Sequence, residues 1–132
     1  MTKPMIRAKL ALTVALIFTP LAASAAQSDV NLFGNWRALD GSSTVAIAKC
    51  SNSPDLCATV VAEQLEAGQP SSVGQVVVRD IRLDKKQNWR GTYILDGANY
   101  AAKIKPISNT SMAFKVCVIA FLCQTQIYER AT

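Results

Sequence analysis

The feature of this chain that most constrains its fold is an alternation of apolar and polar residues in its second half. Ala102 and Ile104 alternate with Lys103 and Lys105, and a period of two recurs from residue 112 to residue 118. Successive side chains of an extended strand point to opposite faces, so this pattern gives each strand one apolar and one polar face. Half-buried antiparallel strands account for it, and the chain is predicted to be all-β.

Turn residues such as Asp40-Gly41 and Asp96-Gly97 separate short apolar segments every eight to twelve positions, which is typical of a β-sandwich or β-barrel. No internal repeat or linker interrupts this pattern. The sequence predicts strands at Phe33–Leu39, Thr44–Cys50, Cys57–Leu65, Gln75–Leu83, Trp89–Leu95, Tyr100–Lys105, Met112–Val118 and Gln124–Arg130.

One segment, residues 54–67, fits two interpretations. A serine, a proline and an aspartate at positions 53–55 form a good helix start, and apolar residues follow at helical spacing. Val60 and Val61, in contrast, favour extended backbone because both are β-branched. We prefer a strand from Cys57 to about Leu65, with the helix as the alternative.

Residues 1–25 have the three-part layout of a secretory signal peptide. Basic residues without any acid come first, an almost wholly apolar segment runs from Leu10 to Ala23, and Ala23-Ser24-Ala25 is a small-residue cleavage site. The apolar segment is shorter than the roughly 20 residues that a spanning helix needs. We expect cleavage, a periplasmic or secreted location and no membrane span in the mature chain; a retained anchor is the alternative.

Cleavage would leave residues 26–132 as a single domain of 107 residues. The signal segment carries three of the 14 Lys and Arg residues and none of the nine acids, so the net charge falls from +5 to +2. The remaining basic residues are scattered along the sequence, which argues against nucleic-acid binding.

The mature chain has four cysteines: Cys50, Cys57, Cys117 and Cys123. Three pairings are possible in principle, but the short spacings within each half favour Cys50 with Cys57 and Cys117 with Cys123, across hairpin ends. Each bridge would close a short loop and stabilise the fold by about 2–2.5 kcal/mol on the chain-entropy model. A zinc site would need two-residue gaps and usually histidine, and the sequence has neither.

The absence of histidine also removes the usual general base and the Ser-His or Cys-His nucleophile pair. Carboxylate pairs remain, Glu63 with Glu66 or Asp80 with Asp84, but we prefer to interpret them as scattered surface acids. Lys49 is the one lysine in phase with inward-facing apolar residues and so the one candidate for a Ser-Lys arrangement. We expect no enzyme, no catalytic residue, no cofactor and no metal site.

Gly34 and Trp36 begin the first predicted strand, and Arg130 ends the last. A Gly-x-Trp at the entrance of a barrel, with an arginine from its final strand, is the closing device of lipocalin-like barrels. The guanidinium can lie over the indole face, a contact worth about 0.5–2 kcal/mol. We therefore expect this pair to join the two ends of the chain.

Taken in order, the motifs resemble one bacterial family. They are Gly34-Asn35-Trp36, Leu56-Cys57, Trp89-Arg90-Gly91, Asp96-Gly97 with Tyr100, and Cys117 to Cys123 followed by Thr125 to Arg130. The chain resembles the domain-of-unknown-function family numbered 2147 from about Leu32 to Arg130. It departs from the family pattern at Tyr128, where tryptophan is usual, at Val116, where glycine is frequent, and in a short loop, Glu66–Gly74. The resemblance implies a bacterial exported protein folded as a small antiparallel up-and-down β-barrel of about eight strands, lipocalin-like (calycin), and implies no established activity.

Two functions compete. The first is a non-enzymatic barrel that holds a small apolar or amphipathic ligand in its lumen, with Trp36, Tyr100, Phe114 and Tyr128 facing inward; core packing is the simpler role for each. The second is a protein-interaction barrel, such as an inhibitor of an envelope-targeting enzyme or protease, with Ser51–Leu56 and Glu66–Gly74 as the exposed segments. A cavity large enough for a ligand favours the first, and a filled barrel with a protruding ordered loop favours the second. The oligomeric state is open.

Arg79 and Arg82 lie within the fourth predicted strand. We expect them on one face of a regular strand, the solvated outer one. A lumenal arginine that binds a carboxylate is the alternative.

Overall fold

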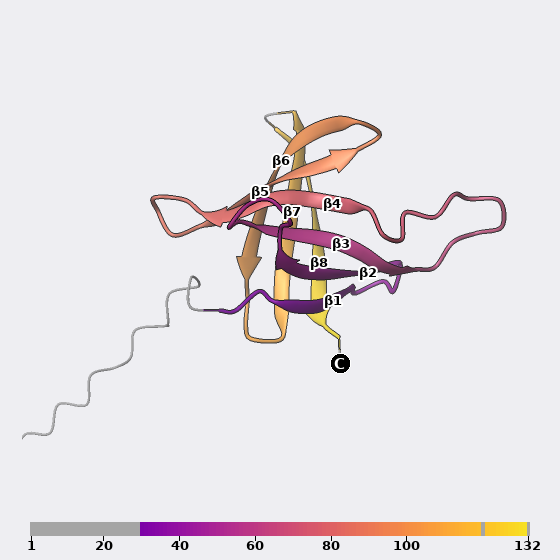
Figure 1. Ribbon diagram of the computed structural model, residues 1–132, viewed down its shortest axis with the longest axis horizontal. Helices are drawn as coiled ribbons and strands as arrows, with labels where there is room; N and C mark the ends of the chain where they lie inside the picture. The colour runs from indigo at the N-terminus through magenta and orange to yellow at the C-terminus, as the bar shows by residue number, and fades with distance from the viewer. Residues whose placement is uncertain (1–29, 120, 132) are drawn as a thin grey trace, which may run out of the picture.

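The computed structural model describes residues 30–119 and 121–131, so the predicted signal peptide, residues 1–25, lies outside the described residues. Eight antiparallel strands follow one another around a closed barrel in chain order, and the first pairs with the last (Figure 1). The strands are β1 Gly34–Ala38, β2 Ser43–Lys49, β3 Leu56–Glu63, β4 Val76–Leu83, β5 Trp89–Leu95, β6 Ala98–Pro106, β7 Ser111–Ile119 and β8 Leu122–Arg130. The predicted fold class and all eight predicted strands are confirmed.

Residues 56–63 form a strand rather than a helix. The hydroxyl of Ser53 does accept a backbone N–H as a cap would, but from Asp55 at 3.0 Å, within the tight turn that joins β2 to β3. Alternate residues of β3 are buried, among them Leu56, Ala58 and Val60. Because this period is two, burial in the barrel interior overrides the local helix signal.

The core fills the end of the barrel where Trp36 of β1 meets Arg130 of β8, which we call the lower end. Trp36, Leu32 and Ile81 are the largest fully buried side chains. Residues from β2, β3, β4, β6 and β7 surround them, including Ile104 and Met112. The inward positions of the alternating strands, as expected, supply this core.

The strand β4 contains a bulge at Asp80, which has a positive φ of 54°. Positions three apart lie on opposite faces of a regular strand, but the extra residue brings Val78 and Ile81 both to the interior. Arg79 and Arg82 therefore share the outer face, as expected, but for a different reason. The expectation of a regular strand was wrong, and the bulge aligns them.

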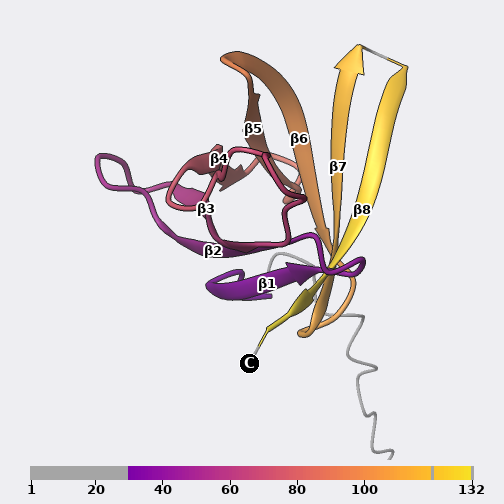
Figure 2. The same cartoon turned by 90° about the vertical axis from the view of Figure 1, so that its right-hand side faces the viewer.

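The barrel is open at its upper end because two hairpins spread apart there. Pairing between β6 and β7 stops at Ala101 and Cys117, while the β5–β6 and β7–β8 hairpins continue beyond that point. Pairing between β1 and β8 covers only Trp36–Ala38 against residues 128–130. Figure 2 shows the two hairpins rising separately above β1 to β4. The lower half is thus a closed barrel, and the upper half is an open mouth.

Within the part of the chain that the structure describes, no helix is long and apolar enough to cross a membrane.

Candidate functional site

The base of the barrel is closed by the predicted pair. The guanidinium carbon of Arg130 lies 4.2 Å from the centroid of the Trp36 ring, and the indole N–H donates to the Leu32 carbonyl at 2.9 Å. Gly34 has a φ of +122°, and a Cβ there would lie 3.1 Å from Nη1 of Arg130. Trp36 is fully buried in this base, so it supports the fold and does not face the mouth.

Arg130 also holds three backbone carbonyl groups, which the sequence does not reveal. It donates to the carbonyl oxygens of Asn109, Phe33 and Asn31 at 2.7–2.8 Å. These charge-assisted hydrogen bonds tie the β6–β7 turn and the segment before β1 to the end of β8. One side chain therefore joins three separate parts of the chain.

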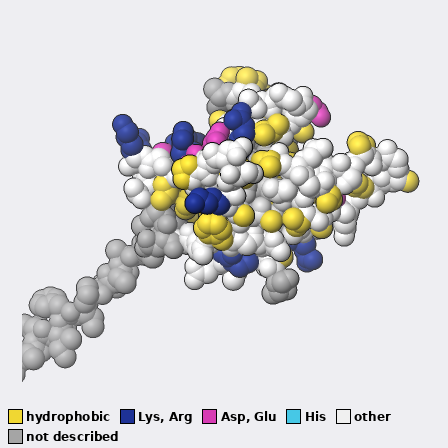
Figure 3. Space-filling view, in the orientation of Figure 1, with side chains coloured by type: hydrophobic (Ala, Val, Ile, Leu, Met, Phe, Trp, Pro, Cys, Tyr) yellow, Lys and Arg dark blue, Asp and Glu magenta, His cyan; other side chains and the backbone are white. Residues whose placement is uncertain are grey.

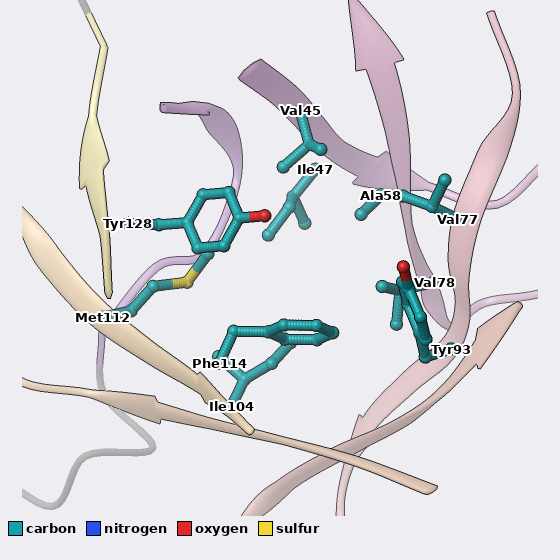
Figure 4. Close-up of a pocket in the computed structure, with 10 residues that line it drawn as sticks. All are labelled: Val45, Ile47, Ala58, Val77, Val78, Tyr93, Ile104, Met112, Phe114 and Tyr128. Atoms are coloured by element: carbon teal, nitrogen blue, oxygen red, sulfur yellow. The ribbon is translucent and has the colours of Figure 1, made fainter. Parts of the chain in front are cut away.

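The lumen above this base is filled by side chains. Its cavity has a volume of about 30 Å³, room for about two water molecules. Figure 4 shows the side chains that converge on it from seven strands. They are Val45, Ile47, Ala58, Val77, Val78, Tyr93, Ile104, Met112, Phe114 and Tyr128. A ligand fully enclosed in this lower chamber, as one hypothesis expected, does not fit.

The open mouth above the lumen is much larger. A groove of about 740 Å³ lies there between the spread hairpins, within the range of about 300–1,000 Å³ typical of ligand pockets. It is lined by Asp40, Tyr93, Leu95, Tyr100, Phe114, Val116, Val118, Gln124, Thr125, Gln126 and Tyr128. The lining is mainly apolar and aromatic, with a few polar groups at one side.

The predicted lumen residues meet at this groove. Phe114 and Tyr128 line both the lower cavity and the mouth, and Tyr100 lines only the mouth. Tyr93, which sequence reasoning missed, packs edge-on against Phe114 at 5.9 Å, and Phe114 packs edge-on against Tyr128 at 6.2 Å. The signal for Tyr93 was its cross-strand position opposite Tyr100 in the β5–β6 hairpin.

Polar groups border the groove where β1 turns into β2. The amide of Gln126 donates to Asp40 at 3.4 Å, and the hydroxyl of Tyr128 lies 3.5 Å from the Gln126 side-chain oxygen. Burial raises the pKa of Tyr128 and that of Tyr93, so both hydroxyls are neutral donors at neutral pH. The hydrogen bonds from Ser42 lower the pKa of Asp40, which keeps that carboxylate ionised. The groove therefore offers aromatic faces together with hydroxyl, amide and carboxylate groups.

Three of the four acidic residues considered as members of catalytic pairs, Glu63, Asp80 and Asp84, have structural partners instead. Asp84 accepts from two backbone N–H groups of its own turn and from Arg90, whose hydrogen bond is the main cause of a pKa lowered to about 2. Asp80 pairs with Arg79 at 3.1 Å. Glu63 accepts from Ser71 and Ser72 in the loop after β3.

Lys49 is exposed at the end of β2, so the inward position considered for it is wrong. The described residues contain no group of three or more His, Cys, Asp or Glu side chains placed to hold a metal ion.

Both predicted disulfides are present. Cys50 is bridged to Cys57 beside the β2–β3 turn, and Cys117 to Cys123 across the β7–β8 hairpin. The second bridge holds the two strands together at the point where β7 leaves β6. It supports the wall of the mouth.

Three exposed segments lie outside the groove, except that Val118 of the third also lines it. The loop from residue 64 to residue 75 projects from the barrel (Figure 1) and is ordered by hydrogen bonds such as Gly74 N–H to the Val60 carbonyl at 2.8 Å. The segment Ser51–Leu56 is exposed only in part, because Leu56 belongs to the core.

Sequence reasoning missed the third segment, the apolar tip of the β7–β8 hairpin, formed by Val118, Ile119, Phe121 and Leu122. Phe121 is 84% exposed and the other three are 51–58% exposed. Consecutive apolar residues that break the period of two between Cys117 and Cys123 were the available signal.

Comparison with known proteins gives a family and a fold. A family model described as "Uncharacterized protein conserved in bacteria (DUF2147)" matches residues 34–130. The structure is similar to that of protein HP1028 from Helicobacter pylori, described as belonging to the lipocalin family, with a TM-score of 0.57 and 17% sequence identity. The match covers 78% of this chain and 84% of that one. No curated protein matches the sequence.

Proposed function

This chain belongs to the bacterial protein family DUF2147, and on that premise we propose that its lipocalin-like barrel binds a small, partly apolar molecule in the groove at its mouth. The observation that carries the proposal is the contrast between a filled lumen of about 30 Å³ and a mouth of about 740 Å³. The aromatic walls would cover the apolar part of the ligand. Asp40, Gln126 and the tyrosine hydroxyls would fix its polar end.

We also propose that the protein is exported and that it has no enzymatic activity. Two disulfides and the signal-like segment 1–25 support a periplasmic or secreted protein, because such bridges persist in oxidising compartments. The lack of histidine and the exposed position of Lys49 support a protein that binds without catalysis. Hydrolase activity of pure protein that disappears in Lys49→Met, with the fold intact by circular dichroism, would contradict this part.

The groove is tested by filling it. Val116 lines the mouth on β7, whereas Ala101 is exposed on the outer face of β6 at the same level of the barrel. Titration with a fluorescent naphthylamine should show saturable binding to the wild type and to Ala101→Trp. Val116→Trp should weaken binding by about tenfold or more, because the indole occupies the space that the probe needs. Equal binding by both variants, or no saturable binding to the wild type, would overturn the proposal.

A second candidate function has support of its own. The lower lumen is filled and the loop 64–75 projects as an ordered segment, the combination expected of a protein-interaction barrel. This loop, rather than Ser51–Leu56, would be the contact segment of an inhibitor. A partner whose binding is lost when residues 66–74 are replaced by a glycine-serine loop, with probe binding unchanged, would establish it.

A further inference from the structure

Four basic residues that are scattered along the sequence lie side by side on the outer face of the barrel. Arg82 on β4 is directly opposite Arg90 on β5, Arg90 is opposite Lys103 on β6, and Lys103 is opposite Lys115 on β7. All four are exposed. With neighbouring strands about 4.8 Å apart, this basic row spans roughly 14 Å. Figure 3 shows several Lys and Arg side chains on the left of the view, in the region of β4 to β6, with a few Asp and Glu side chains between them.

The charges of this row are only half compensated. Arg82 pairs with Asp55 and Arg90 pairs with Asp84. Among the described residues, no acidic side chain lies within salt-bridge distance of Lys103 or Lys115, or of Lys105 two residues along β6. Like charges directly opposite one another destabilise a sheet. A row of this kind is therefore costly for the isolated fold and suits an anionic partner.

A second feature lies on the same strand. The apolar tip begins at Val118, three residues beyond Lys115, and Phe121 within it is 84% exposed. Lys115 and Ile119 are four positions apart along the strand, a distance of about 13–14 Å. The interfacial layer of a bilayer is about 5–7 Å deep, so lysine side chains at that height can reach the phosphate groups while the tip enters the layer.

We propose that the barrel docks on an anionic membrane surface, with the apolar tip inserted among the lipid headgroups and the basic row set against their phosphates. A nucleic acid would match the basic row but would leave the tip in water. An anionic bilayer accommodates both features, because an interface binds aromatic side chains as well as cations. This surface differs from the groove, which opens between the hairpins and shares only Val118 with the tip.

The test is co-sedimentation of the mature, disulfide-bonded protein with vesicles. Vesicles containing phosphatidylglycerol should bind it at low salt, and vesicles of phosphatidylcholine alone should bind it much less. Binding should fall steeply at about 0.5 M salt, because charges at a surface are screened. Lys103→Gln combined with Lys115→Gln should weaken the partition by about ten- to thirtyfold.

Matched variants distinguish binding by the basic row and the apolar tip from effects of net charge and of exposed apolar residues in general. Arg37→Gln with Lys49→Gln removes the same charge from exposed positions on β1 and β2 and should leave binding nearly unchanged. Phe121→Ser should weaken binding about tenfold, whereas Val73→Ser, at a 51% exposed position in the loop after β3, should not. Equal losses in the matched variants, absence of binding to anionic vesicles, or duplex DNA binding that is as strong and independent of Phe121 would each overturn the proposal.

Discussion

Gly91 occupies a position in the barrel where any side chain would make close contacts, which the composition does not reveal. It lies on β5 opposite the bulge of β4, where a Cβ would be 3.0 Å from Val78 Cγ1 and 3.1 Å from the Arg79 carbonyl oxygen. Because one of these contacts is with backbone, side-chain rotation alone cannot relieve it. The glycine therefore allows β4 and β5 to pair across the bulge.

Gly91→Ala should accordingly lower the free energy of unfolding by about 1–3 kcal/mol, the usual cost of forcing an extra group into a packed site. Thr92→Ala, one residue further on and facing outward, should change it by less than about 0.5 kcal/mol. Urea denaturation of the two variants measures the difference. Equal stabilities of the two variants would mean that β4 leaves room for a side chain at position 91.

Asp84 should contribute to the stability of the fold in acid. Folding lowers the pKa of Asp84 from 3.8 to about 2, chiefly through Arg90, so between these values the unfolded chain binds the proton more readily. The contribution of Asp84 is thus fully present above about pH 4 and is lost as the pH falls towards 2. Asp84→Asn should show a shallower loss of stability over this window. Identical pH profiles for the two proteins would contradict the role given to Arg90.

At the scale of elements, β1 and β8 close the barrel through a short pairing that Arg130 reinforces. Trp36→Ala should cost about 3–5 kcal/mol through lost burial. Arg130→Ala should also be costly, because three carbonyl oxygens lose their donor along with the ring contact. A double-mutant cycle should give a coupling of about 0.5–2 kcal/mol. Additive losses of stability would contradict a stabilising cation–π contact between Trp36 and Arg130.

The β7–β8 hairpin depends on its disulfide in a different way. Above Cys117 the strand β7 has no partner in β6, so its pairing with β8 and the bridge to Cys123 hold the mouth wall. Replacing both cysteines by serine should lower stability by about 2–3 kcal/mol. The rate of backbone amide hydrogen exchange should rise most in residues 116–124. A uniform increase over the whole barrel would indicate that the bridge acts on global stability alone.

The sequence alone predicts the strands, but it does not predict where β4 bulges or where the hairpins diverge. The period of two in residues 98–106 and 111–119 is a local property, so it predicts these strands and their inward faces. The bulge at Asp80 and the divergence of the hairpins above Ala101 depend on packing between strands. The basic row likewise appears only when the register is known, because Arg82 and Lys115 are far apart in sequence.

Taken as a whole, the barrel has a closed, packed half and an open half, and the proposed binding site lies in the open one. The lower half is closed by Trp36 and Arg130 and filled by side chains, and the upper half remains open between two hairpins. Of the aromatic residues predicted for the lumen, Phe114 and Tyr128 lie where these halves meet, whereas Tyr100 lines only the mouth and Trp36 lies in the base. The sequence predicts that these aromatic residues face inward. It does not predict the level at which the barrel opens, because that level depends on where pairing between β6 and β7 ends.

Native mass spectrometry of the protein purified from its own host tests whether the mouth holds a ligand, with Val116→Trp and Ala101→Trp as comparisons. We expect a polypeptide mass corresponding to residues 26–132 with two disulfides, and a small-molecule adduct on the wild type and on Ala101→Trp. The adduct should be strongly reduced in Val116→Trp, whose indole occupies part of the groove. An adduct as abundant in Val116→Trp as in the wild type, or bare polypeptide in all three proteins, would contradict a ligand site at the mouth.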